Sequence, residues 1–163
     1  MKFSSRYQRA KSGTKTGFTL VEMLVVLVLL GLIFQISITS FFAITKQQNL
    51  DKDVENAYSY LLKARNQTLN GESNSVYGVR FATTSVSLFK GPTYSVASTT
   101  SVYSFVNKSY ISTISLTGGA YDVVFSRISG NPSATGTVTY KIGSLSTVQK
   151  TIIIHGSGLV EVQ

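Results

Sequence analysis

The sequence predicts an α+β protein in which one long N-terminal α-helix, with a membrane half and an amphipathic half, packs on a C-terminal antiparallel β-sandwich. Three observations lead to this prediction. Residues 23–45 carry no charge, apolar residues keep helical spacing up to residue 69, and a two-residue alternation begins after Gly71. The chain has 163 residues, which is enough for one modest domain plus an extension.

The composition excludes several classes of protein. The chain is 43% hydrophobic and only 13% charged, so it is neither disordered nor a coiled coil. It has no Cys, which excludes disulfides, thiolate zinc sites and cysteine nucleophiles. The net charge is +8, but residues 1–17 contain five basic residues and no acidic one, which leaves +3 for the rest. The basic excess is therefore mostly an N-terminal tail rather than a nucleic-acid-binding surface.

The uncharged run over residues 23–45 predicts a transmembrane helix, since 23 helical residues extend roughly 35 Å. The basic tail in front of it predicts that residues 1–17 stay in the cytoplasm and that the C-terminal part crosses the membrane. A buried helix of a soluble domain and a cleaved secretory signal are the alternatives. The second needs a small-x-small site, and Phe41 is too bulky for the one candidate, which ends at Ala43.

Glu22 lies at the boundary of this apolar run, where a carboxylate costs solvation unless it has a partner. It belongs to the stretch Lys15-Thr16-Gly17-Phe18-Thr19-Leu20-Val21-Glu22-Met23-Leu24. This stretch resembles the prepilin signal of type IV pilins and type II secretion pseudopilins. The alternative is that Glu22 is simply an interfacial residue near the lipid head groups.

The resemblance implies specific processing. Residues 1–17 would be a cytoplasmic leader that a prepilin peptidase removes between Gly17 and Phe18, and the new amine of Phe18 would be methylated. Glu22 would then be the fifth mature residue and would neutralise the Phe18 amine of a neighbouring subunit during assembly. A desolvated pair of this kind fixes the register between neighbouring subunits more than it adds to the stability of their assembly.

The helix is expected to continue to residue 70, which gives a helix of roughly 80 Å in total. Asn70-Gly71 is a stop signal, and the segment 46–70 has one apolar face for core packing with most charged residues, from Asp51 to Arg65, on the other face. Gly31 is the position where the helix is expected to be least stable in its apolar half. Two explanations remain open: the helix melts locally there in a filament, or the glycine allows close packing against another helix.

Residues 71–163 are expected to form an extracytoplasmic β domain of eight short strands separated by Gly-rich and Pro-containing turns. The predicted strands are residues 76–81, 85–89, 101–106, 110–116, 121–126, 135–142, 148–155 and 159–162.

A second, more scattered resemblance concerns H-type minor pseudopilins and their pilin relatives. It consists of residues 61–65 at the predicted helix end and of the tail, including Val124-Phe125, residues 136–139 and residues 151–160. Relatives often carry an Arg after the last glycine of the tail, and some of them are proposed to bind DNA through such basic tails. Here Leu159, Val160 and Glu161 follow Gly158, which weighs against DNA binding.

The sequence contains no recognisable catalytic, metal or cofactor motif. His155 is the single His, the seven acidic residues are dispersed, and there is no P-loop or dinucleotide fingerprint. We therefore expect neither enzyme activity nor a cofactor.

The leading hypothesis is a structural subunit, a minor pilin or pseudopilin, of a type IV pilus or type II secretion pseudopilus. Its expected partners are other pilin subunits, prepilin peptidase and inner-membrane lipid. The alternative is a pilin-like binding module that captures DNA or a surface ligand through its β domain, with basic residues on or beside the strands: Lys90, Lys108, Arg127, Lys141 and Lys150. A simple one-pass anchor that retains residues 1–17 is the third hypothesis.

Overall fold

The structure is a computed structural model that describes residues 17–105, 108–143 and 148–163, without the side chains of residues 36–43. One helix, α1 (Leu20–Leu69), runs through two compact units, residues 1–40 and 41–163. It ends one residue before the predicted boundary. Within the described part of the chain, no helix combines the length and the apolar character that a membrane span requires.

The end of α1 follows from the local sequence. The N–H of Asn70 still donates to the carbonyl of Asn66 at 2.9 Å, but Gly71 has φ +63°. This left-handed conformation is the one that glycine adopts at the end of many helices. A short 3₁₀ turn, η1 (Glu72–Asn74), then leads into the first strand.

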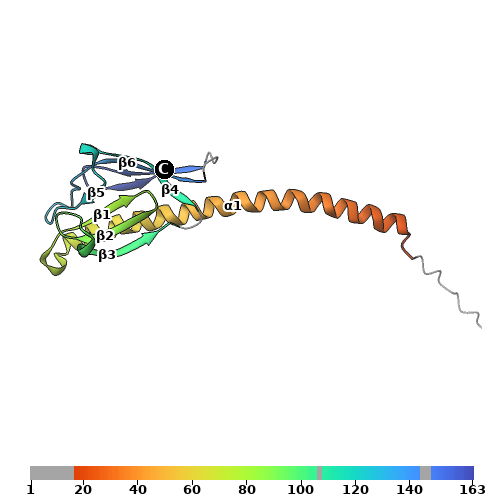
Figure 1. Ribbon diagram of the computed structural model, residues 1–163, viewed down its shortest axis with the longest axis horizontal. Coiled ribbons are helices and arrows are strands. Elements are labelled where there is room, and N and C mark those ends of the chain that lie inside the picture. The colour runs from red at the N-terminus through yellow and green to blue at the C-terminus, as the bar shows by residue number, and fades with distance from the viewer. Residues whose placement is uncertain (1–16, 106–107, 144–147) are drawn as a thin grey trace, which may run out of the picture. The chain divides into compact units, whose positions relative to one another are not determined.

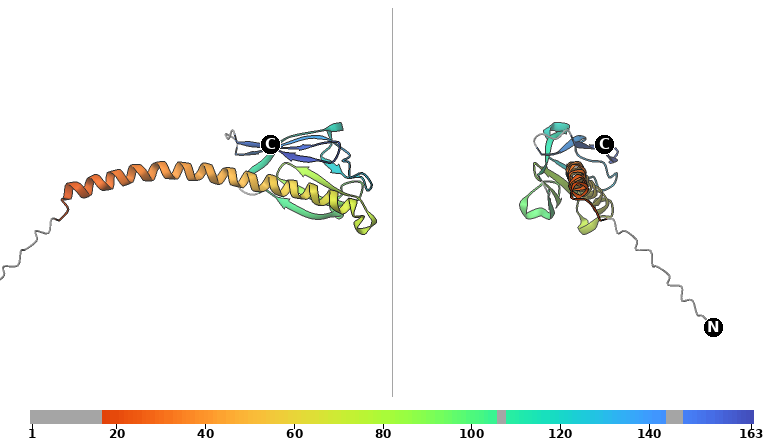
Figure 2. Two further views of the ribbon diagram at one scale, coloured as in Figure 1. Left: turned by 180° about the vertical axis from the view of Figure 1, so that it is seen from behind. Right: turned by 90° about the vertical axis from the view of Figure 1, so that its right-hand side faces the viewer.

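The β part of the second unit consists of two four-stranded antiparallel sheets (Figures 1 and 2). The first has the order β3-β2-β1-β5 and the second β4-β6-β7-β8. Their strands are β1 (Tyr77–Ala82), β2 (Ser85–Lys90), β3 (Thr99–Ser104), β4 (Ser109–Leu116), β5 (Asp122–Val124), β6 (Gly136–Ile142), β7 (Gln149–Ile154) and β8 (Val160–Val162). Two further 3₁₀ turns are η2 (Val96–Ser98) and η3 (Thr117–Gly119).

The predicted strands agree with these eight to within two residues at each end. Strand β5 stops at Val124, although the alternation continues to Ser126. Phe125 makes an isolated bridge to Pro132, and the N–H of Ser126 bonds the carbonyl of Asn131, so the chain turns back on itself there. The predicted end of the third strand, Val106, lies outside the described residues.

A single core joins the second half of α1 to both sheets. The helix contributes a stripe of buried residues at helical spacing: Leu50, Val54, Ala57, Leu61 and Ala64. The sheets contribute large, fully buried side chains such as Phe81 from β1 and Tyr140 from β6. This packing is the amphipathic arrangement that the spacing predicts.

Two residues of the second, scattered resemblance, Arg65 and Gly158, come together near the end of α1. The Arg65 guanidinium donates through Nε to the carbonyl of Gly130 at 3.2 Å. Gly158, in the turn between β7 and β8, has φ +80°, and a Cβ there would lie 2.7 Å from Arg65 Nε. A larger residue does not fit at position 158, so this glycine lets the turn approach the helix closely.

Candidate processing and assembly site

Gly17 and Phe18 lie just before the first helical turn, in a segment without regular structure. A Cβ at Gly17 would meet no described atom within 4 Å, and Phe18 is 77% exposed. The peptide bond between them is therefore open on the Phe18 side and unhindered at Gly17. The leader residues 1–16 lie outside the described residues.

Thr19 caps the helix that follows. Its Oγ1 accepts a hydrogen bond from the N–H of Glu22 at 3.2 Å, and its carbonyl accepts one from the N–H of Met23 at 3.2 Å. This is one half of a capping box, in which Thr and Glu stand three residues apart. Thr19 is a residue that the sequence reasoning missed, although the Thr-x-x-Glu spacing was visible.

Glu22 is the acidic residue of the first turn of α1, and it is exposed. A carboxylate in this position interacts favourably with the unpaired N–H groups at the start of a helix. The capping bond uses the backbone N–H of Glu22, so its carboxylate remains available to a partner. Glu22 can therefore take part in the helix cap through its backbone and in assembly through its carboxylate.

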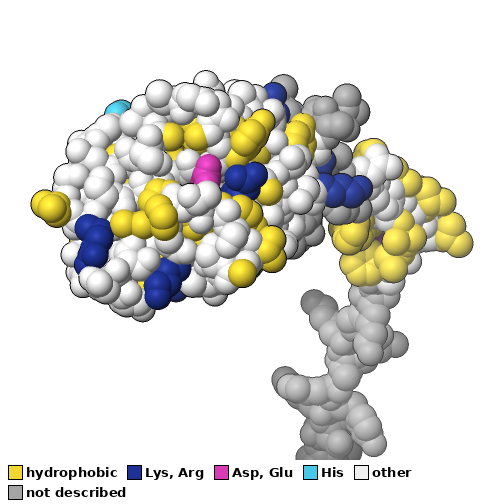
Figure 3. All heavy atoms as spheres, turned by 60° about the vertical axis from the view of Figure 1, so that its left-hand side comes forward, with side chains coloured by type: hydrophobic (Ala, Val, Ile, Leu, Met, Phe, Trp, Pro, Cys, Tyr) yellow, Lys and Arg dark blue, Asp and Glu magenta, His cyan; other side chains and the backbone are white. Residues whose placement is uncertain are grey.

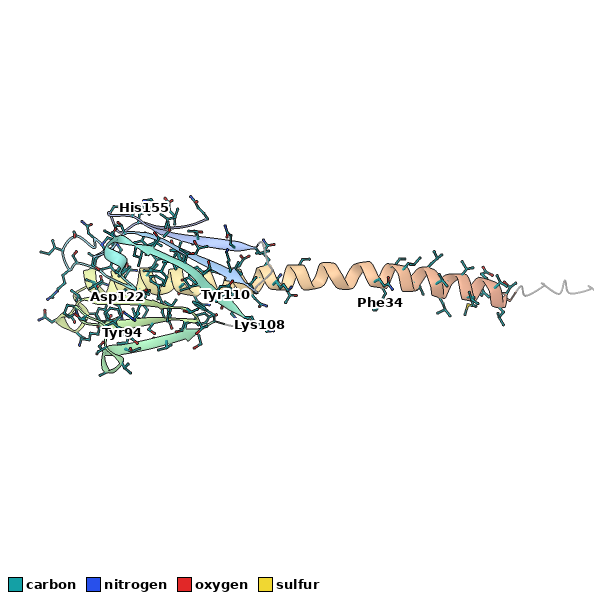
Figure 4. All side chains as sticks on the ribbon, turned by 45° about the horizontal axis from the view of Figure 1, so that its top comes forward. Phe34, Tyr94, Lys108, Tyr110, Asp122 and His155 are labelled. Carbon is teal, nitrogen blue, oxygen red and sulfur yellow. The ribbon has the colours of Figure 1, made fainter. Side chains whose placement is uncertain are left out.

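The described first part of α1 is apolar on all sides. Between Leu20 and Phe34 every large hydrophobic side chain is at least 44% exposed, and Phe34, at 71%, projects outward from the helix (Figure 4). A helix that is hydrophobic all round needs an apolar environment, either a membrane or other helices. Gly31 lies in this part, and a Cβ there would meet nothing within 4 Å.

Asp53 corrects one sequence expectation, because it is fully buried rather than on the charged face of α1. Its position fits the stripe of Leu50, Val54 and Ala57, which sequence spacing alone could have shown. The Tyr103 hydroxyl donates to Asp53 Oδ1 at 2.7 Å. Burial and this hydrogen bond raise the pKa of Tyr103 to about 12, and burial, then the Asp53 charge, raises the pKa of Tyr140.

Two of the five basic residues of the binding hypothesis contact other side chains of the same chain. Lys150 Nζ pairs with Asp51 Oδ1 at 2.8 Å, and Arg127 donates to Asn74 Oδ1 at 2.7 Å. Basic side chains are spread over the face that Figure 3 shows. Of these two, Lys150 is neutralised by an acidic partner, whereas Arg127 keeps its net charge.

His155 lies at the end of β7, exposed, with Nε2 3.4 Å from Glu161 Oε2 (Figure 4). Among the described residues there is no group of three or more His, Asp or Glu side chains that could hold a metal ion.

Comparisons with known proteins agree with this geometry. Residues 14–34 match the model of the prokaryotic N-terminal methylation motif. The fold is similar to the crystal structure of the type IV minor pilin FimU of Pseudomonas aeruginosa, with a TM-score of 0.57 and 12% identity over 74% of this chain and 92% of that chain. No curated protein matches the sequence.

The chain therefore combines a pilin-like α+β fold with a prokaryotic N-terminal methylation motif at the start of its long helix.

Proposed function

We propose that the protein is a minor pilin or pseudopilin, a structural subunit of a type IV pilus or a type II secretion pseudopilus. The observation that carries the proposal is the methylation motif over residues 14–34, placed at the start of the helix of a pilin-like fold. A solved structure with a similar fold is that of a type IV minor pilin. The role of such a subunit is structural rather than catalytic.

Processing occurs between Gly17 and Phe18 in this proposal, and the amine of Phe18 is then methylated. The exposure of Phe18 and the open space around Gly17 support it, because a peptidase must bind the scissile segment in an extended form. Gly17 is well suited to this, since it has no side chain to obstruct the cleft.

Assembly joins the mature N-terminus of one subunit to Glu22 of its neighbour. The exposed carboxylate supports this role, and so does the apolar surface of α1 around it, which would be buried among other helices. In that surrounding the charged amine and the carboxylate each need the other, because a single buried charge is strongly unfavourable.

Before assembly, the protein is anchored in the inner membrane with its N-terminus in the cytoplasm. The five basic residues of the leader and the uncharged run over 23–45 support this orientation. The proposed divisions are a leader at 1–17, a membrane half at 18–45, an amphipathic half at 46–70 and an extracytoplasmic β domain at 71–163.

The test is the intact mass of the protein recovered from membranes of cells that express a prepilin peptidase. The expected product begins at Phe18, with one added methyl group. A Gly17→Val variant is the control, because its branched side chain would obstruct the cleft and leave the leader in place. A wild-type chain that still begins at Met1 would reduce the N-terminus to an ordinary anchor.

A further inference from the structure

Strand β8 is the edge of the second sheet, and its outer side has free hydrogen-bonding groups. Thr151 and Gln163 exchange two backbone hydrogen bonds, at 2.8 and 2.9 Å. In an antiparallel pair such residues alternate with pairs whose N–H and C=O groups point outward. Val160 and Val162 occupy these alternate positions, so their backbone groups point away from β7. Within the described chain no other strand pairs with this side.

The free edge borders a groove between β8 and α1, with a volume of about 570 Å³. The helix wall of the groove consists of Asp51, Val54, Glu55 and Tyr58. These residues lie along one face of α1, because residues three or four positions apart are neighbours on a helix surface. The other wall contains Lys150 and all three residues of β8. The groove thus combines unpaired backbone groups with apolar side chains, which are the two requirements for adding a strand.

The free edge has more acidic than basic residues beside it. Of the seven acidic residues, three lie there: Asp51 and Glu55 on α1, and Glu161 in β8, whose side chain points to the opposite face of the sheet from Val162 and lies 3.4 Å from His155 Nε2. Lys150 is the single basic residue among the described lining residues, and it pairs with Asp51. Glu55 and Glu161 are both exposed. An occupant of this groove would therefore be favoured if it carried positive charge.

We propose that an extended segment of a different protein, with alternating apolar and basic residues, adds to β8 as a fifth strand of this sheet. Its apolar side chains would face Val54, Tyr58 and Val162. Its basic side chain would lie opposite Glu161, which points to the other face of the sheet with Ile153. That position is a non-hydrogen-bonded pair on the outer side, where opposing side chains are closest.

A second copy of this chain does not supply such a segment. Its strands that contain a basic residue, β1, β2, β6 and β7, already pair on both sides. Its edge strands β3, β4, β5 and β8 contain no basic residue. The charge pattern of the groove therefore indicates a partner with another sequence.

The first experiment measures binding of a fluorescent peptide, Thr-Val-Lys-Val-Lys-Val-Thr, to the full chain in detergent micelles by anisotropy. A peptide with Glu in place of Lys is the charge control, and a peptide N-methylated along one edge is the backbone control. We expect the lysine peptide to bind at least tenfold more tightly than either. Equal binding of the N-methylated peptide would overturn strand addition, and so would absence of binding by all three.

The second experiment uses Val162→Pro, which removes an outward N–H and leaves the native bonds of β7 intact, because edge positions of this kind accept proline. We expect at least tenfold weaker binding, whereas Val162→Ala keeps the N–H and stays within threefold. Glu161→Gln should weaken binding several-fold, and Glu72→Gln, an exposed acid outside the groove, should not.

Self-association is the competing outcome. If the chain dimerises in a manner that Val162→Pro abolishes while the lysine peptide does not bind, the different-protein partner is wrong. These assays do not involve leader cleavage or filament incorporation, so their failure leaves the proposed subunit function intact.

Discussion

At the scale of single residues, Glu22 serves two interactions through different atoms. Its backbone N–H completes the cap of Thr19, whereas its carboxylate is exposed and is the group proposed to pair with a neighbouring amine. Helix initiation and assembly can therefore be separated by substitution. Glu22→Gln keeps the capping bond and the side-chain shape but removes the charge.

We predict that Glu22→Gln lowers incorporation into filaments by more than tenfold, because leaving one partner of a desolvated pair alone costs about 3–5 kcal/mol. Thr19→Ala is the matched control: it removes the cap, at a local cost of about 0.5–2 kcal/mol, and should leave incorporation nearly unchanged. Membrane and sheared-filament fractions, compared by immunoblot, measure both variants. Normal incorporation of Glu22→Gln would exclude the proposed pairing.

The buried carboxylate of Asp53 is the second feature at this scale. Tyr103→Phe removes the hydroxyl that donates to it at 2.7 Å, so we expect the free energy of unfolding to fall by about 1–3 kcal/mol. The measurement is urea unfolding of the full chain, followed by circular dichroism. Tyr121→Phe is the control, because Tyr121 is 55% exposed. Equal stability of the two variants would show that the Tyr103 bond contributes little.

At the scale of elements, the turn between β7 and β8 depends on close approach to α1. Gly158→Ala combines a φ of +80° with a Cβ directed at Gly130 and Arg65, so we expect it to destabilise the fold by more than about 1 kcal/mol. Gly119→Ala is the matched control, with φ +69° but no atom within 4 Å. Similar losses in thermal unfolding would mean that backbone strain alone matters and the contact with the helix does not.

The elements themselves were largely predictable from local patterns. Apolar spacing located α1, and two-residue alternation with glycine turns located all eight strands. The pairing of strands was not predictable, since β1 lies beside β5 and β4 beside β6 because of contacts between distant segments. For the same reason the sequence did not reveal the groove at β8, which exists only where α1 and the C-terminal strand meet.

The candidate site was predictable to a different degree. Gly17, Phe18 and Glu22 form an ordered local motif, so they could be named without a structure, and their roles stay predictions. Asp53 was expected on the charged face, although its spacing from Leu50, Val54 and Ala57 fits the buried stripe. Its hydrogen bond with Tyr103, fifty residues away, could not be predicted from the local sequence.

At the scale of the whole molecule, charge is distributed unevenly along the chain. Five of the fifteen basic residues precede Phe18, and three of the seven acidic residues lie in or beside β8. If the leader is removed, the net charge falls from +8 to +3. Processing would thus change the electrostatic character of the chain as well as its N-terminus.

Stability of the molecule should fall at alkaline pH, with the midpoint of urea unfolding as the measurement. Tyr103 has a pKa of about 12 in the folded chain, and an ordinary tyrosine has about 10. The unfolded chain therefore loses its proton first, so the stabilisation is complete below pH 10 and is lost as the pH rises towards 12. Tyr140, whose pKa is also raised, acts in the same direction.

Tyr103→Phe should make this alkaline decline shallower, because the variant has no proton to release at that position, whereas Tyr121→Phe should retain the wild-type profile. The comparison uses the full chain at pH 8, 10, 11 and 12. Both variants keep every lysine and arginine, so the effect of their titration on stability is the same in the two variants. A parallel decline in the two variants would place the pH dependence elsewhere in the molecule and exclude the Asp53–Tyr103 bond as its origin.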